Sequence, residues 1–390
     1  MNTFLNHAEV RELAKRRLPR GIFEFIDRGT EDEGCLRNNR EAFDAVRIRP
    51  RVLTGGGPRS QAITLFGQAC DIPIIAAPTA CAGLVRFRGE VELAKAAAAN
   101  RMPFCAALEA INSLEDITEA SAGSVWFQVY VWQDEQLVRD LLTRAWSLGV
   151  RTLVVTLDSP VESKREYNLR NGFGMPFKRS ARTVCDVALH PRWAIGVLGR
   201  YVASGRVPSH ANYPPGHRST IFASSKPLAY QTDLGWSHMH WLRDQWKGNL
   251  VLKGILHPGD ALLASELGAD GIVVSNHGGR TFDSAVAPIE VLPDIARAVG
   301  DRTTILADSG VRRGSDVLKL MAAGARAVMV GRMLLYATAV GGMSGASQAI
   351  GILRSEIDSS LAMCGCKDIR DVDGSLLVGA DRGVEPVSRG

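Results

Sequence analysis

The chain has 390 residues, of which 46% are hydrophobic and 22% charged, with a formal net charge of +5. This composition is typical of a globular protein, long enough for one large domain or two medium ones. No basic block with interleaved aromatic residues is present, so the sequence predicts no nucleic-acid binding. The seven cysteines are scattered, and the closest pair, Cys364 and Cys366, lacks the two-residue gap of common zinc and redox motifs. We therefore expect reduced thiols, no metal site and a cytoplasmic protein.

Residues 1–70 are interpreted as a helical N-terminal extension. Their first segment, MNTFLNHAEVRELAKRRLPR, contains Glu9 and Glu12 and no apolar core, so we do not expect a signal peptide. No window of the chain approaches 18 uninterrupted apolar residues, which predicts that no segment spans a membrane.

From residue 71 to about 370, short apolar segments rich in β-branched residues alternate with helix-like segments. Each apolar segment suits a strand buried on both faces. The predicted strands cover residues 72–78, 103–108, 125–131, 152–158, 249–254, 271–276, 303–308 and 326–332. The predicted helices between them include residues 89–101, 134–149, 259–270 and 314–325. Eight such units predict an α/β fold, a (β/α)8 TIM barrel within a single domain of residues 1–390. An open doubly wound sheet is disfavoured because no early Gly-x-Gly-x-x-Gly turn is present.

Residues 159–248 form a long insertion after the fourth predicted strand. Insertions of this length are typical of mobile lids. Within it, residues 190–205 predict a short helix that carries several apolar side chains. We favour packing of this helix on the barrel or on a neighbouring subunit. The alternative is a weak peripheral contact with the inner face of a membrane.

Polar residues follow nearly every predicted strand, at the end of a barrel where catalytic groups collect. A buried lysine or aspartate without a partner is costly, so one shared pocket explains the set better than separate core groups do. The polar residues at the first six strand ends are Thr79, Gln128, Tyr130, Thr156, Asp158, Lys253, Ser275 and His277. The last two ends combine small residues with cations, which is the usual position of a phosphate in such barrels. These residues are Asp308, Ser309, Gly310, Arg312, Arg313, Gly331 and Arg332.

Four segments carry a resemblance to a known family. SNHGGRTFD at 275–283, DSGVRRGSDVLKLMAAGARAVMVGR at 308–332, and FQVYV with TLDSPVESKRE at 127–131 and 156–166 resemble the FMN-dependent α-hydroxy acid oxidases and dehydrogenases. This family includes glycolate oxidase, L-lactate dehydrogenase and (S)-mandelate dehydrogenase. The likeness runs from about residue 10 to residue 370. MPFKRSARTVCDVALHPRW and PTACAGLVRFRGE look most similar to the mandelate dehydrogenase branch.

The resemblance implies FMN-dependent oxidation of an (S)-2-hydroxy acid, either lactate or an acid with an aryl or bulky side chain, to the 2-oxo acid. His277 would be the base, since histidine is the residue type most often used as a general base, and Asp158 would orient it. Tyr130 would donate a hydrogen bond to the substrate oxygen. Lys253 would stabilise the reduced flavin ring. Arg280 and Arg165 would bind the substrate carboxylate.

The resemblance also implies the cofactor contacts. The ring and ribityl chain of FMN would contact Pro78, Thr79, Ala80, Gln128, Thr156, Lys253 and Ser275. The ribityl chain and phosphate would contact Asp308, Gly310, Arg312, Gly331 and Arg332. A homotetramer is implied as well. The electron acceptor stays open between dioxygen, a quinone and another carrier.

Three positions depart from the family pattern. Phe25 stands where relatives often have a tyrosine that binds the substrate carboxylate, which removes a hydrogen bond worth about 1.5–3 kcal/mol. Ala107 replaces a flavin-contacting serine, and Glu109 replaces a tryptophan or a small residue. One interpretation, which we favour, turns Glu109 toward solvent or an arginine of the insertion. The other places Glu109 in the pocket, where it would repel a second substrate carboxylate and favour a hydroxyl, amide or amine group.

Two alternative functions remain open. The departures would suit an FMN oxidase that acts on a modified hydroxy acid or an amine in a biosynthetic pathway. The third hypothesis is a flavin-binding protein without turnover. The joint presence of the predicted base, acid, lysine and both arginines argues against it.

Overall fold

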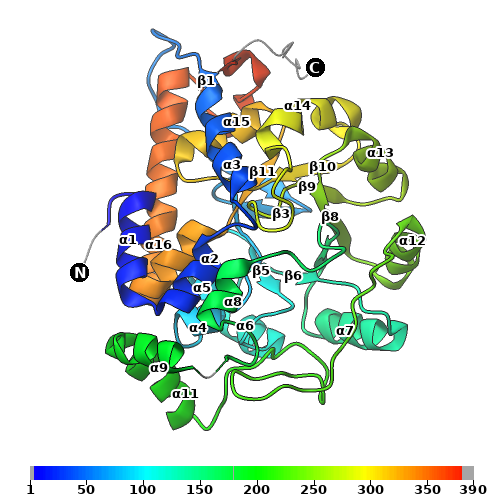
Figure 1. Cartoon of the computed structure of the whole chain (residues 1–390). Coiled ribbons are helices and arrows are strands. Elements are labelled where there is room, and N and C mark those ends of the chain that lie inside the picture. The colour runs from blue at the N-terminus through cyan, green and yellow to red at the C-terminus, as the bar shows by residue number, and fades with distance from the viewer. Residues whose placement is uncertain (1–3, 179, 380–390) are drawn as a thin grey trace.

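The computed structural model describes residues 4–178 and 180–379, which fold around a closed barrel of eight parallel strands (Figure 1). The ends of the predicted domain, residues 1–3 and 380–390, and residue 179 lie outside this description. The barrel strands are β4 (Ile74–Ala76), β5 (Phe104–Ala107), β6 (Val125–Val129), β7 (Thr152–Thr156), β8 (Asn249–Ile255), β9 (Gly271–Val274), β10 (Thr304–Ala307) and β11 (Ala327–Val330). Each strand lies within or overlaps its predicted segment, and β11 pairs with β4 to close the ring. The predicted (β/α)8 barrel is confirmed.

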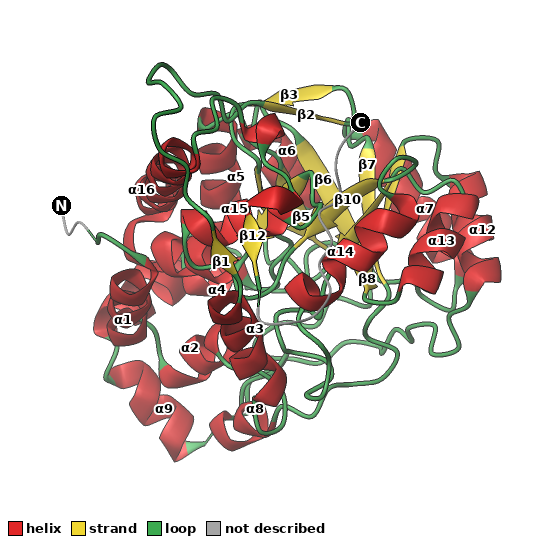
Figure 2. Cartoon of the chain, turned by 90° about the horizontal axis from the view of Figure 1, so that it is seen from above, coloured by secondary structure: helices red, strands yellow, loops and turns green. Residues whose placement is uncertain are grey.

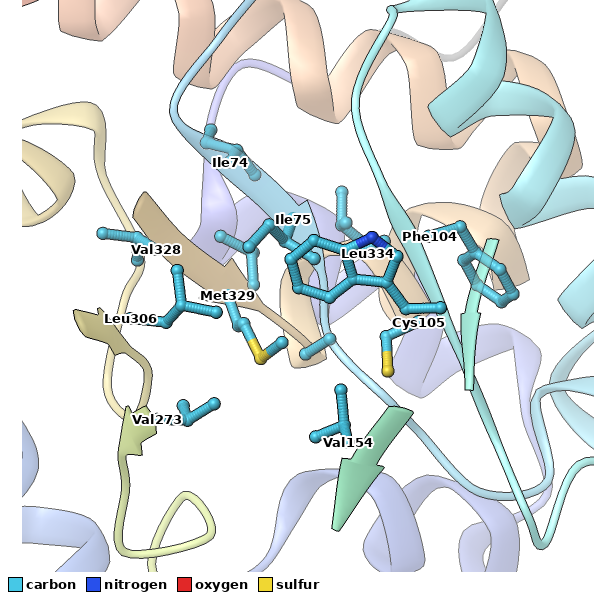
Figure 3. Packing of buried hydrophobic residues seen from close by; sticks show 14 of the residues in the cluster. Ile74, Ile75, Phe104, Cys105, Val154, Val273, Leu306, Val328, Met329 and Leu334 are labelled. Carbon is cyan, nitrogen blue, oxygen red and sulfur yellow. The ribbon is translucent and has the colours of Figure 1, made fainter. Parts of the chain in front are cut away.

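The barrel interior is filled by apolar side chains from different strands. Figure 3 shows Cys105, Val154, Val273 and Met329 gathered in one cluster, and all four are at most 1% exposed. Burial of each large aliphatic side chain contributes roughly 1.5–3 kcal/mol. This packing explains why the strands are continuous apolar runs rather than alternating ones.

Helices surround the strands. They include α5 (Gly89–Ala99), α6 (Leu114–Ala120), α7 (Glu135–Ser147), α13 (Pro258–Glu266), α14 (Pro288–Val299), α15 (Gly314–Ala322) and α16 (Arg332–Cys364). α7 illustrates how the sequence sets their ends. The Asp134 side chain accepts hydrogen bonds from the first backbone amides, Leu141 and Leu142 are buried, and the helix ends before Gly149, whose φ is +85°.

The N-terminal extension contains three helices, α1 (His7–Arg17), α2 (Arg20–Asp27) and α3 (Gly34–Ala45). It is not purely helical, because β1 (Arg47–Ile48) and the hairpin of β2 (Ile63–Leu65) and β3 (Gln68–Cys70) follow. β1 pairs with β12 (Leu377–Val378) near the other end of the chain, and the two strands lie side by side in Figure 2. Short 3-10 turns at Ile369–Asp371 and Gly374–Leu376 lead into β12.

The insertion between β7 and β8 contains short helices joined by long loops. Its helices are α8 (Glu166–Asn171), α9 (Ala181–Ala188), α10 (Pro191–Trp193), the π-helix Ala194–Gly199, α11 (Arg200–Ala203) and α12 (Trp236–Gln245). The helix predicted at 190–205 is present as α10, the π-helix and α11 in succession. Trp193 anchors it, because the Trp193 indole is buried and donates to the Leu84 carbonyl at 2.6 Å. In the part of the chain that is described, no helix is long and apolar enough to cross a membrane.

Candidate active site

A cavity of about 1110 Å³ lies at the C-terminal ends of the barrel strands and extends under α1 and α2. Ligand pockets for single small molecules typically have volumes of about 300–1,000 Å³, so this cavity has room for a cofactor and a small acid. The predicted site residues that line it are Phe25, Pro78, Thr79, Ala80, Glu109, Gln128, Tyr130, Thr156, Arg165, Lys253, His277, Arg280, Asp308, Gly310, Arg312, Gly331 and Arg332. The other two, Asp158 and Ser275, lie behind this wall and contact residues that line it.

His277 and Asp158 form an ion-pair geometry at the ends of β9 and β7. Nδ1 of His277 lies 2.9 Å from Oδ1 of Asp158. Burial alone would raise the pKa of Asp158, but the interactions with His277 and then Lys253 lower it below its ordinary value. The carboxylate therefore fixes the ring orientation and leaves Nε2 without a hydrogen-bond partner among the described residues.

The backbone at His277 is unusual. Its φ is +59°, in the left-handed region that residues with a Cβ rarely adopt. Two hydrogen bonds hold this loop, from the His277 amide to Ser275 Oγ at 3.0 Å and from the Gly278 amide to Ser309 Oγ at 3.0 Å. Strained backbone of this kind often occurs where a side chain must be aimed at a ligand.

Lys253 is a buried cation at the base of the cavity. Its Nζ donates to Ser275 Oγ at 2.7 Å and lies 3.1 Å from Oδ2 of Asp308. Burial opposes the charge, but Asp308 and then Asp158 raise the pKa of Lys253 above its ordinary value. The ammonium group is therefore retained at the cavity wall, where it can stabilise negative charge on a ligand.

Polar side chains on β6 and β7 complete the wall. Nε2 of Gln128 donates to Oγ1 of Thr156 at 3.0 Å, and Oε1 of Gln128 accepts from the Leu108 amide at 3.3 Å. Tyr130 follows two residues after Gln128, so both side chains point to the same side. Burial and then Glu109 raise the pKa of Tyr130 well above its ordinary value, so its hydroxyl stays protonated as a donor.

Two arginines at the cavity have no carboxylate partner in the described parts of the chain. Nη1 of Arg280 donates to the backbone carbonyls of Phe25 and Arg28 at 2.6 and 3.1 Å. Nε of Arg165 donates to the Arg280 carbonyl at 3.3 Å. Desolvation and then repulsion by Arg165 lower the pKa of Arg280. Adjacent cations that repel each other form a strong site for an anionic group such as a carboxylate.

The ends of β10 and β11 suit a phosphate. Gly310 has φ of +81°, and the Arg312 guanidinium has no hydrogen-bond or ion-pair partner among residues 4–178 and 180–379. Burial and then Arg40 lower the pKa of Arg312, which indicates a cation that lacks a counter-ion. Arg332 instead donates to the carbonyls of Ile26 and Arg28, at 3.2 and 3.3 Å. The backbone at Gly310 and the Arg312 guanidinium fit the phosphate of FMN, and the buried Lys253 fits its ring.

The favoured interpretation of Glu109 is wrong. Glu109 lines the cavity, and it forms no ion pair with any described residue. Its Oε1 accepts hydrogen bonds from Tyr230 at 3.1 Å and from Tyr213 at 3.4 Å. Both tyrosines belong to the insertion, 104 and 121 residues away in sequence, which is why the direction of Glu109 could not be read from its own neighbours.

Sequence reasoning missed the wall that the N-terminal extension supplies. Asp27 accepts two hydrogen bonds from Arg11, at 2.6 and 2.7 Å, and one from the Tyr336 hydroxyl at 2.7 Å. These residues come from α1, α2 and α16, and all three line the cavity. Phe25 also lines it, with its ring stacked on Phe173 at a centroid distance of 4.4 Å. No local pattern connects positions so distant in sequence. In the described residues, no His, Cys, Asp or Glu cluster could hold a metal ion.

The barrel fold and the residues that line its cavity define a class of protein, the cofactor-dependent barrel oxidoreductases. The His277–Asp158 pair, the buried Lys253 and the Arg312 guanidinium together suit a flavin. A sequence model described as FMN-dependent dehydrogenase matches residues 14–379, so the chain belongs to this family. It is an FMN-dependent oxidoreductase.

Individual relatives agree with this assignment. The chain is 39% identical over 376 residues to an L-lactate dehydrogenase of Caulobacter sp. (strain K31), which covers 96% of this chain and 98% of that protein. It is 38% identical over 375 residues to an L-lactate dehydrogenase of Bartonella tribocorum, covering 96% and 97%. Among solved structures, the monotopic membrane protein (S)-mandelate dehydrogenase superposes with a TM-score of 0.90 at 33% identity, covering 97% and 100%. A mandelate oxidase with (S)-2-phenylpropionate superposes with a TM-score of 0.80 at 32% identity, covering 97% and 99%.

Proposed function

We propose that this enzyme oxidises an (S)-2-hydroxy acid with an aryl or bulky side chain to the corresponding 2-oxo acid. One observation carries the proposal. The His277–Asp158 pair lines or adjoins the same cavity as Arg165 and Arg280, two cations that have no carboxylate partner in the described part of the chain. A 2-hydroxy acid has a carboxylate next to the carbon that is oxidised, so binding of the first group brings the second to the base.

Each residue has a role in this proposal. The guanidinium groups of Arg280 and Arg165 bind the carboxylate, and Nε2 of His277 accepts a proton from the substrate. Asp158 stabilises the imidazolium that results, as the acid of a catalytic triad does. Tyr130 donates a hydrogen bond to the substrate oxygen. The same atom of His277 serves as base whether the α-carbon or the hydroxyl loses the proton.

Bound FMN supplies the chemistry of accepting the two electrons. Lys253, with Gln128 and Thr156, would hold the ring, and the positive charge of Lys253 would stabilise negative charge there. Arg312 and the backbone at Gly310 would hold the phosphate. The remaining cofactor contacts in the proposal are Pro78, Thr79, Ala80, Ser275, Asp308, Gly331 and Arg332.

The test is a substrate panel on the purified, flavin-loaded protein without oxygen. We expect (S)-mandelate and related 2-hydroxy acids to bleach the absorbance of the oxidised flavin, and the (R)-enantiomers to leave it unchanged. If dithionite bleaches the flavin and an amine panel does so as well while every hydroxy acid fails, the amine oxidase alternative replaces this proposal. If only dithionite bleaches it, the protein binds flavin without turnover.

We further propose that the insertion attaches the enzyme to a membrane surface, where a quinone is the electron acceptor. Ile195 and Val202 are each 73% exposed although they lie on the segment that Trp193 anchors, and Val184 and Leu189 on and beside α9 are also exposed. Exposed apolar side chains beside arginines are typical of helices that bind membrane surfaces. The mandelate dehydrogenase with the TM-score of 0.90 is itself described as monotopic.

Sedimentation with phospholipid vesicles tests the attachment. The native protein should sediment with vesicles, and a variant with Ile195→Gln and Val202→Gln should stay in solution with unchanged flavin reduction. A variant that loses its oligomeric state instead would assign this face to a subunit contact. Analytical ultracentrifugation of both proteins measures that state, for which we propose a homotetramer. Comparing reoxidation by a soluble quinone with that by dioxygen tests the acceptor.

A further inference from the structure

Glu109 is the feature of the cavity that the proposed chemistry does not use. It follows β5, and two backbone hydrogen bonds fix its turn, from Cys81 to the Glu109 carbonyl at 3.3 Å and from Ala110 to the Ala107 carbonyl at 3.1 Å. The strand end therefore fixes the backbone of Glu109 at the cavity wall.

Aromatic residues of the insertion hold one oxygen of this carboxylate. Tyr230 and Tyr213 both donate to Oε1, which uses their two hydroxyl protons, and their hydroxyl oxygens lie in contact with each other. Their rings are held in turn, Tyr230 against Tyr130 with centroids 5.3 Å apart and Tyr213 against Trp132 at 5.6 Å. The other oxygen, Oε2, accepts no hydrogen bond from any described residue. The tyrosines thus hold Oε1, and Oε2 can accept a hydrogen bond from a ligand.

A part-buried carboxylate without a counter-ion is costly unless its lone pairs are satisfied. Glu109 has no arginine or lysine partner in the described chain. Its charge acts on the cavity, because Glu109 is the largest cause after burial of the raised pKa of Tyr130. A substrate that brings a hydrogen-bond donor to Oε2 would satisfy the remaining lone pairs inside the cavity.

Charge balance selects the kind of donor. His277 pairs with Asp158 and Lys253 with Asp308, which leaves Arg165, Arg280 and Glu109 as the charged side chains of the substrate region without an ion-pair partner among the described residues. The carboxylate of a 2-hydroxy acid brings this set to neutrality. A hydroxyl donor preserves that balance, an ammonium group adds a positive charge, and a second carboxylate would face Glu109 directly.

We propose that Glu109 is a specificity-determining residue that accepts a hydrogen bond from a hydroxyl group on the substrate side chain. The preferred substrates would be 2-hydroxy acids with a bulky side chain that carries this hydroxyl group remote from the carboxylate. This inference rests on the proposed function, because the carboxylate must occupy the arginines for the side chain to reach Glu109.

The experiment compares (S)-mandelate with three ring-substituted derivatives in anaerobic flavin reduction by the flavin-loaded enzyme. The derivatives are 3-hydroxy-, 4-hydroxy- and 4-methoxymandelate, of which the last keeps the ring oxygen but lacks the hydrogen-bond donor. A hydrogen bond to a charged acceptor predicts that the better hydroxy derivative exceeds mandelate in kcat/KM by about 10- to 100-fold. The methoxy derivative should show no such gain.

Variants assign the effect to Glu109. Glu109→Ala should abolish the preference for the hydroxy derivative, and Glu109→Gln, which keeps the shape, should reduce it. Glu119→Gln is the matched control, since Glu119 is an exposed glutamate on the next helix, α6, and should keep the native preference. Dissociation constants of the hydroxylated and plain aryl 2-oxo acid products, read from the flavin spectrum, should follow the same order.

The outcomes separate this inference from the proposed function. Flavin reduction by mandelate with the same ranking in native enzyme and Glu109→Ala overturns the inference alone. A preference for an aminomethyl or a carboxyl derivative over the hydroxy derivatives also overturns it. Failure of every hydroxy acid to reduce the flavin in the native enzyme overturns the proposed function, and the inference with it.

Discussion

The barrel strand ends and the insertion between β7 and β8 contribute to the same cavity in different ways. Two charged pairs lie at the strand ends, His277 with Asp158 and Lys253 with Asp308. The insertion contributes Arg165, which has no counter-ion among the described residues, and the tyrosines that hold Glu109. This difference indicates that the barrel carries the chemistry, and that the insertion adapts the cavity to a substrate.

The two regions differ in what fixes their geometry. Parallel strand pairing sets the positions of strand-end residues, as when Thr156 pairs with Lys253 across β7 and β8 and Ala107 pairs with Gln128 across β5 and β6. The insertion has short helices and long loops, so single side-chain contacts hold its residues. Substitutions in the His277–Asp158 pair should therefore change the rate of chemistry, and substitutions of the insertion tyrosines that hold Glu109 should change selectivity.

The largest effect is expected at the strand end of β9. His277→Ala should lower the rate of flavin reduction by about 10²–10⁴-fold, because the proton acceptor is lost. The protein should keep FMN, since its proposed contacts lie elsewhere. Stopped-flow reduction and the flavin content of the purified variant measure both quantities. Near-native reduction would remove His277 from the proposed mechanism.

The two arginines offer a direct comparison of the regions. Arg280→Met, on the barrel loop, should raise KM by about 10- to 100-fold, as expected for a lost charged hydrogen bond. Arg165→Met, on the insertion, should have a smaller effect, because Arg280 with its two backbone contacts stays in place. Steady-state kinetics of both variants decide the order. A larger effect at Arg165 would reverse the assignment of roles.

Tyr130→Phe should have an intermediate effect. Loss of one hydrogen bond to the substrate oxygen predicts a decrease of about 3- to 10-fold in the reduction rate. Because the pKa of Tyr130 is raised, its ionisation should not shape the native profile between pH 6 and 9. An alkaline limb near pH 9 that disappears in this variant would contradict the neutral-donor role.

The smallest effect is expected at the part of the cavity wall that α1 and α2 supply. Like the strand ends, this part of the wall contains a charged pair, Arg11 with Asp27. Burial alone would raise the pKa of Asp27, but hydrogen bonds from Arg11 and Tyr336 lower it. Asp27→Asn should reduce the free energy of unfolding by about 1 kcal/mol at pH 6, since the ion pair is partly exposed. The folded-state pKa of Asp27 lies below the ordinary value of about 3.9. The difference in unfolding free energy between the native protein and Asp27→Asn should therefore have its full size above that pH. It should shrink as the pH falls through the folded-state value.

Guanidinium unfolding at a series of pH values measures this difference. Glu12→Gln serves as the control, because exposed Glu12 contacts Arg11 without touching Asp27. A difference between native and Asp27→Asn that persists unchanged in acid would mean that the charge of Asp27 contributes nothing.

Much of this architecture could be predicted from the sequence because its signals are local. A buried parallel strand is a run of apolar β-branched residues, and the residues that follow it necessarily meet at one end of a barrel. The gathering of His277, Lys253 and Arg280 around one cavity followed from that rule together with the family resemblance. The left-handed backbone at His277 gave no such signal, since only a few per cent of non-glycine residues adopt it and the sequence does not mark which ones do.

The remaining features depend on contacts between distant segments. Glu109 points into the cavity because two tyrosines from the insertion donate to it, and no periodic pattern marks those tyrosines. The Asp27 pairing joins helices at opposite ends of the chain. Contacts of this kind are set by tertiary packing, which a single sequence does not reveal.

The pairing of β1 with β12 ties the segment after α3 to residues 377–378, and the Arg49 amide also donates to the Leu376 carbonyl at 2.7 Å. Ribosomal synthesis proceeds from the N-terminus, so α1 and α2, which line the cavity, are made first. The pairing of β1 with β12 can form only after residues 377–378 have been made. A nascent chain halted near residue 360 should therefore be cleaved readily by protease within its first 50 residues. Release of the finished polypeptide should make the same segment resistant.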